Sequence, residues 1–108
     1  MTIHIPDLHY QTDATRVGQM PANVPPLLAN GIRNYVERGL RCGSFLNAVL
    51  ENDLCLAVAR ADGQSRACLC DLVWWLIDNV PSDCWGNREK VAAWIKRHER
   101  IRTAEELP

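Results

Sequence analysis

The sequence has no apolar stretch long enough to cross a membrane and no secretory signal. No uninterrupted apolar run, including residues 72–77, exceeds six positions, whereas a membrane-spanning helix needs about 20. Residues 1–16 lack the basic segment followed by a long apolar segment that a signal peptide requires. We therefore expect a cytoplasmic protein with no membrane partner.

Residues that favour β-strands are scarce. The chain has one Phe and two Tyr beside its four Trp, and its Val, Ile and Thr residues do not form alternating runs. At 108 residues, with 47% hydrophobic and 23% charged residues, it has the composition of one ordinary globular domain. The sequence predicts an all-α fold with a single core.

Apolar residues at helical spacing, together with capping residues, predict a compact bundle of about five helices. Pro25 and Pro26 suit a first helical turn, and Gly39 supplies a stop. The predicted helices cover residues 23–39, a short stretch capped by Ser44, residues 54–61 capped by Asn52 or Asp53, residues 64–79 capped by Asp62, and residues 88–102 capped by Asn87. They form one domain, residues 25–102, between a poorly structured arm, residues 1–24, with a short strand at residues 2–5, and an acidic tail, residues 103–108.

The fourth predicted helix contains adjacent tryptophans and is expected at the centre of the bundle. Trp74 and Trp75 point about 100° apart on a helix, so we expect this helix to be buried most of the way round, with one indole at the surface. Its continuous apolar side consists of Leu69, Leu72, Val73, Leu76 and Val80. The third helix is expected to present Leu54, Ala57, Val58 and Ala61 to the core.

The cysteines are odd in number and poorly spaced for a metal. Side chains two positions apart on a helix diverge by about 200°, so Cys68 and Cys70 do not easily bind one ion with Cys84 and His98. We predict free thiols that pack as small hydrophobic residues. The five are Cys42, Cys55, Cys68, Cys70 and Cys84.

No motif of an enzyme is present. A Gly-rich phosphate loop, a strand-turn-helix nucleophile and paired carboxylates are all missing, and Ser44 is best explained as a helix cap. His4, Asp7 and His9 are the ligand types of a facial iron site, but they lie in a Pro-containing terminal arm that does not favour a rigid, dry cavity. We predict no enzymatic activity, no catalytic residue, no metal and no cofactor.

The whole chain has no net positive charge, but basic residues are concentrated near its C-terminus. Lys and Arg number 12 against 13 Asp and Glu, whereas residues 88–102 carry six Lys or Arg and two Glu, a local net charge of +4. This charge can bind a partner or simply complement a helix C-terminus, and Trp85 can anchor a partner or cover the core. The candidate partner-binding residues are Trp85, Arg88, Lys90, Lys96, Arg97 and Arg100.

Three segments, GIRNYVERGLRCGSFLNAVLENDL, AVARAD and WLIDNVPSDCWGNREKVAAWI, resemble a family of small proteins from phages, prophages and plasmids that has no established activity. The resemblance covers about residues 31–95, and the GSFLxAVLxNDL element is its most specific part. Asn87 stands where the family commonly has Ser, and Cys68 and Cys70 lie outside its pattern.

The resemblance implies a mobile-element protein in the bacterial cytoplasm, with no catalytic residue to carry over. Small phage proteins of this kind commonly bind and block a larger host assembly, including CRISPR complexes. We therefore predict a non-enzymatic protein-binding module, in its sharpest form an anti-CRISPR-like inhibitor of a host complex, with a host or phage protein as its partner. The alternative is a small nucleic-acid-binding regulator that uses the basic last helix. The sequence does not decide between a monomer and a homodimer.

Overall fold

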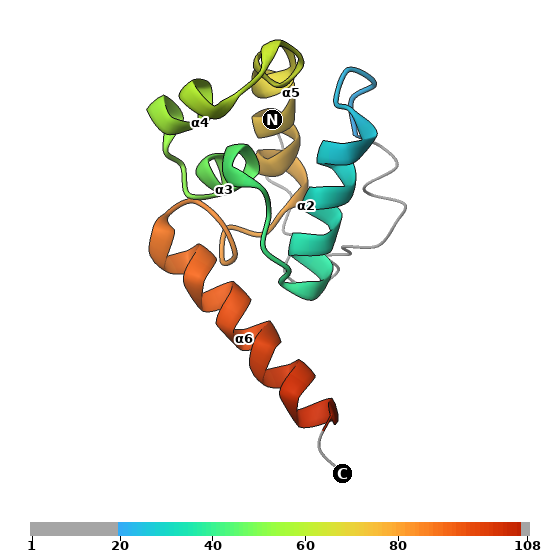
Figure 1. The fold of residues 1–108 in the computed structure, drawn as a ribbon, viewed down its shortest axis with the longest axis vertical. Helices are drawn as coiled ribbons and strands as arrows, with labels where there is room; N and C mark the ends of the chain where they lie inside the picture. The colour runs from blue at the N-terminus through green and yellow to red at the C-terminus, as the bar shows by residue number, and fades with distance from the viewer. Residues whose placement is uncertain (1–19, 107–108) are drawn as a thin grey trace.

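The computed structural model describes residues 20–106, which fold into five helices without a β-strand in that range. The helices are α2 Pro26–Arg38, α3 Ser44–Leu50, α4 Leu54–Arg60, α5 Gly63–Asn79 and α6 Arg88–Glu106 (Figure 1). The all-α prediction is confirmed. The strand predicted at residues 2–5, with His4, Asp7 and His9, lies outside the described residues.

Three short polar side chains start helices as predicted. Asp53 accepts a hydrogen bond from the Leu56 backbone N–H at 3.1 Å, and Asp62 accepts one from the Ser65 N–H at 2.7 Å. Asn87 does the same at the start of α6, described below. The prediction for Ser44 is wrong, because Gly43 is the N-cap of α3 and no side chain caps this helix.

The core is formed by residues from all five helices. Its largest fully buried side chains are Tyr35, Ile32, Leu50, Leu72, Leu76 and Val91. In α4 only Ala57 of the helix itself and the following Ala61 are buried, whereas Leu54 and Val58 are 66% and 42% exposed. The prediction that these two larger residues face the core is therefore wrong. Val58 follows Ala57 by one position and so points about 100° away from the buried side.

The double-tryptophan helix is buried on one side. Trp75 lies in the core with 7% of its surface exposed, while Trp74 is 60% exposed, so one indole does reach the surface. Cys70 and Ile77 are exposed as well. The expectation of burial most of the way round is wrong, because the described helices cover only the side of α5 that carries Leu72, Trp75 and Leu76.

The last helix extends away from the other four. Figure 1 shows α6 extending beyond the body formed by α2 to α5, while His98 and Arg102 in its C-terminal half contact the end of α2 at Gly39 and at the Arg38 carbonyl. The helix continues to Glu106, four residues beyond its predicted end at Arg102, because residues 103–106 contain no Gly or Pro to stop it. No helix among the described residues is long and apolar enough to cross a bilayer.

Candidate functional site

The first half of α6 is fixed to the core by hydrogen bonds. Asn87 caps it through a bond from the Lys90 N–H to Asn87 Oδ1 at 2.8 Å. The Trp94 indole N–H donates to the Tyr35 backbone carbonyl at 2.9 Å, and the Tyr35 hydroxyl donates to the Cys84 carbonyl. The start of α6, the end of α2 and the loop between α5 and α6 are therefore held together.

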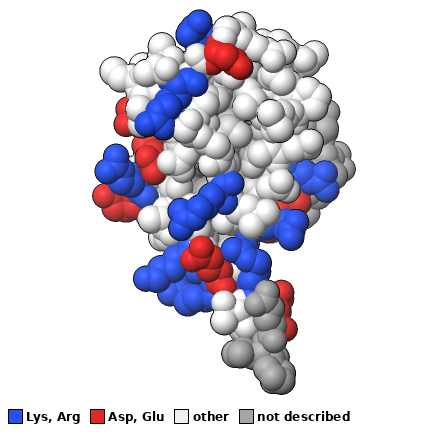
Figure 2. All heavy atoms as spheres, viewed as in Figure 1, with Lys and Arg blue, Asp and Glu red and all other residues white. Residues whose placement is uncertain are grey.

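One side of α6 carries unpaired positive charge. Val91 and Ile95 are buried, whereas Lys96, Arg97 and Arg100 are exposed on the other side of the helix. Figure 2 shows basic side chains gathered where α6 leaves the body. We call these three residues the basic face. Arg97 stacks over the Trp94 ring at 5.7 Å, and neither Lys96 nor Arg100 forms an ion pair within the described residues.

The remaining basic residues of this region are paired or less exposed. Arg88 pairs with Glu51 at 3.8 Å, and an Arg102 N–H donates to the Arg38 carbonyl. Lys90 is half-buried, unlike the three residues of the basic face; burial raises the pKa of Cys84, and the charge of Lys90 opposes that rise. The six residues proposed from the sequence therefore do not form one patch. Arg88 and Arg100 are separated by about 18 Å along the helix axis.

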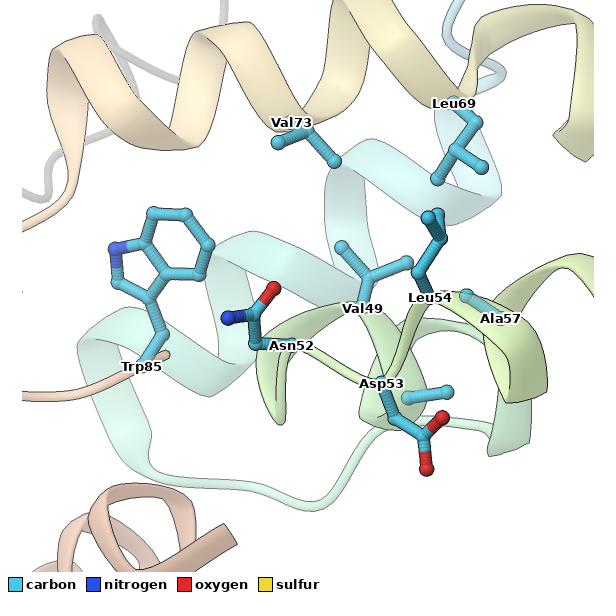
Figure 3. Close-up of a pocket in the computed structure, with 9 residues that line it drawn as sticks. Val49, Asn52, Asp53, Leu54, Ala57, Leu69, Val73 and Trp85 are labelled. Atoms are coloured by element: carbon cyan, nitrogen blue, oxygen red, sulfur yellow. The ribbon is translucent and has the colours of Figure 1, made fainter. Parts of the chain in front are cut away.

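Trp85 lines a small apolar cleft instead of projecting into solvent. It is half-buried, and its indole N–H donates to the Val80 carbonyl at 3.3 Å. In Figure 3 its ring closes one end of the cleft, opposite Leu54 and beneath Val73. This placement favours the interpretation of Trp85 as a cover for the core. The lining residues are Ala48, Val49, Asn52, Asp53, Leu54, Ala57, Leu69, Val73 and Trp85.

The size and lining of this cleft suit one side chain better than a cofactor. Its volume is about 130 Å³, below the roughly 300 Å³ at which small-molecule sites begin. Asp53, its acidic residue, already accepts a hydrogen bond as the cap of α4. The cleft therefore offers apolar contact and the Asn52 amide, with no free acid or base.

The cysteines are placed on different sides of the fold. Cys68 and Cys84 are buried, as predicted for packing thiols, but Cys55 and Cys70 are exposed, which corrects that prediction for these two. Burial raises the pKa of Cys84 and of half-buried Cys42 to about 12, so neither forms the nucleophilic thiolate near neutral pH. Among residues 20–106 no three His, Cys, Asp or Glu side chains come together as metal ligands.

Sequence reasoning missed a second apolar stripe on α5. Ala67, Cys70, Trp74 and Ile77 are all exposed and are spaced by three or four positions. That spacing places them on one side of the helix, and it is visible in the sequence. The sequence does not single it out, because the other apolar stripe of α5 already supplies a side that can face the core.

Comparisons with protein-family models, curated proteins and solved structures gave no match. The resemblance to a phage and plasmid family stays a prediction.

Proposed function

We propose that this chain is a non-enzymatic protein-binding module that docks its basic face onto an acidic surface of a partner protein. The observation that carries the proposal is the exposure of Lys96, Arg97 and Arg100 together on one side of α6, without an ion pair to any described residue. Lys96 and Arg100 are four positions apart, so both point the same way on the helix. Unpaired cations on the exposed side of a helix can reach a partner without rearrangement of the core.

Nucleic acid is the less favoured partner for the same surface. Binding to single-stranded nucleic acid uses exposed aromatic rings on which the bases stack. On α6 the aromatic ring next to the basic face is Trp94, which is half-buried and whose N–H is bonded to Tyr35. Positive charge without an exposed stacking ring fits an acidic protein surface better.

The resemblance to mobile-element proteins gives this proposal a biological setting. A small module that binds a host complex through one charged helix suits an inhibitor, and counter-defence against a CRISPR complex is its sharpest form. This step is an analogy with other small phage proteins. The basic face itself specifies only that the partner presents acidic residues.

Charge reversal on the basic face tests the proposal. The tagged full chain and its Lys96→Glu/Arg100→Glu variant are expressed in a bacterial host, captured, and compared by quantitative mass spectrometry. We expect the variant to retain about tenfold less of the specific partner, because reversed charges face an acidic surface. Both residues are exposed, so the helical circular dichroism signal should stay unchanged.

A matched pair of single variants separates position from total charge. Arg100→Glu and Arg60→Glu change the net charge equally, and both residues are exposed, but Arg60 lies on α4. The Arg60 variant should capture the partner normally. Equal capture by Arg100→Glu and wild type would overturn the proposal. Binding of wild type to duplex DNA that falls steeply with salt, and is lost in Arg100→Glu, would replace it with the nucleic-acid alternative.

A further inference from the structure

The exposed side of α5 carries a basic residue near one end and an acidic residue near the other. Arg66, Cys70, Trp74 and Asp78 follow one another at intervals of four residues, and all four are exposed. Residues at this spacing form a single ridge along a helix surface. We call these four residues the α5 ridge. Ala67 and Ile77 lie beside it, and Ile77 is 55% exposed.

Two copies of this ridge that run antiparallel would match each other in charge and in side-chain size. If two copies of α5 run antiparallel with a two-fold axis level with Leu72, position 66 of one copy faces position 78 of the other, and position 70 faces position 74. Arg66 then faces Asp78, and the small Cys70 faces the large Trp74. By the same relation Ala67 is level with Ile77. Each large or charged side chain thus meets a small or oppositely charged one.

Helix packing rules give this pairing a definite geometry. Rows of residues four apart are inclined by about 26° to the helix axis, and aligning two such rows gives a crossing angle of about −50°, the commonest class in globular proteins. Arg66 and Asp78 are twelve residues apart, which is about 18 Å along α5. A ridge of that length spans a complete helix crossing.

We propose that a second copy of this chain covers the α5 ridge, forming a two-fold symmetric dimer through antiparallel α5 helices. Such an interface is isologous, so each contact occurs twice. Asp78 forms no ion pair within the described residues, and Arg66 uses one N–H on the Ala61 carbonyl at 3.1 Å while its guanidinium carries further donors. Both residues are therefore able to pair across the axis.

Trp74 should provide most of the affinity. Tryptophan is among the residues that dominate interfaces, whereas exposed ion pairs add little each. The dimer leaves the basic face on α6 outside the contact between the two ridges. A chain that does not dimerise could therefore still bind a partner through α6, and a chain that binds no such partner could still dimerise.

Sedimentation velocity of the full chain over a concentration series, in reducing buffer, tests the dimer. We expect Trp74→Glu to raise the dimer dissociation constant at least tenfold. Leu27→Glu is the matched control, because Leu27 is 81% exposed but lies on α2, and it should leave the dissociation constant unchanged. A wild-type chain that stays monomeric up to about 1 mM, roughly the weak limit of specific association, would overturn the proposal.

Charge exchange tests the antiparallel register. Arg66→Asp and Asp78→Arg should each weaken the homodimer about fivefold, since two weak pairs become repulsive. The double variant should restore it. A mixture of the two single variants should form a heterodimer tighter than either homodimer, because both pairs are then attractive. A dimer indifferent to these exchanges would contradict the register.

A photo-cross-linking residue at position 77, which keeps Trp74 in place, distinguishes the possible occupants of the ridge. We expect a cross-link between two chains that maps to the region of Ala67. A cross-link within one chain to residues 1–19 would overturn the proposal and assign the ridge to the N-terminal segment. A cross-link to another protein in cells, with no self-cross-link in the purified chain, would overturn it in favour of a partner.

Discussion

Replacing Gly39 with alanine is expected to lower the free energy of unfolding by about 3 kcal/mol. Gly39 ends α2 with φ 64°, in the left-handed region, where a side chain costs roughly 1 to 2 kcal/mol. A Cβ added there would lie 2.4 Å from the Cβ of His98 on α6. Forcing an extra carbon into such a contact costs roughly 1 to 3 kcal/mol more. Urea unfolding followed by circular dichroism measures the change.

Two control variants separate the close contact from backbone strain. Gly43→Ala should change stability by less than about 1 kcal/mol, because a Cβ there meets nothing within 4 Å. Gly39→Asn tests the contact itself, since asparagine tolerates the left-handed conformation yet still places a Cβ against His98. It should remain strongly destabilising. A loss below about 1 kcal/mol for Gly39→Ala would show that α6 can move off α2 at little cost.

Features determined by neighbouring residues in the sequence were predictable. Asp53, Asp62 and Asn87 cap helices because a short polar side chain reaches N–H groups three positions ahead, which requires no knowledge of the tertiary structure. Gly39 was predicted as the end of α2 for the same local reason. Its contact with His98, 59 residues further on, could not be predicted from that local pattern.

Exposure was predicted less well, because it depends on where other helices lie. Apolar residues at helical spacing occur on two sides of α5, and periodicity alone does not tell which side is covered. The same difficulty misplaced Leu54 and Val58, which are exposed although they match a core pattern.

In the candidate site, too, the local feature was predictable and the tertiary contacts were not. The positive charge of residues 88–102 was evident from the sequence, but charge alone does not reveal which cations are free. Arg88 is paired with Glu51, 37 residues earlier, and Arg102 is bonded to the Arg38 carbonyl. Both partners come from other parts of the chain. Only after these contacts are known does the basic face reduce to Lys96, Arg97 and Arg100.

Raising the pH from 7 to about 10.5 is expected to remove several kcal/mol from the free energy of unfolding. Burial raises the pKa of Cys42 and Cys84 from 9.0 to about 12, and it also raises the pKa of the Tyr35 phenol above its ordinary 10.0. The folded state therefore keeps these protons after the unfolded chain has released them. Their contribution is complete below about pH 9 and is lost as pH rises towards 12. In that window each thiol lowers the free energy of unfolding by roughly 1 kcal/mol per pH unit.

The thiols can be tested individually against exposed cysteines of the same chain. Urea midpoints at pH 7, 9 and 10.5, measured with a phosphine reductant, should fall steeply above pH 9 for wild type and equally for Cys55→Ser/Cys70→Ser, since both altered residues are exposed. Cys42→Ala should flatten the alkaline slope by about one proton, whatever it does to stability at pH 7. After burial, the charge of the Cys84 thiolate is a further cause of the raised pKa of Tyr35, so Cys84→Ala reports on both groups. Two outcomes would contradict this: an unfolding free energy that is constant from pH 9 to 10.5, or an alkaline slope of that free energy that Cys42→Ala and Cys84→Ala leave unchanged. Either would mean that water reaches these thiols and that the junction of α2, α5 and α6 is open in solution.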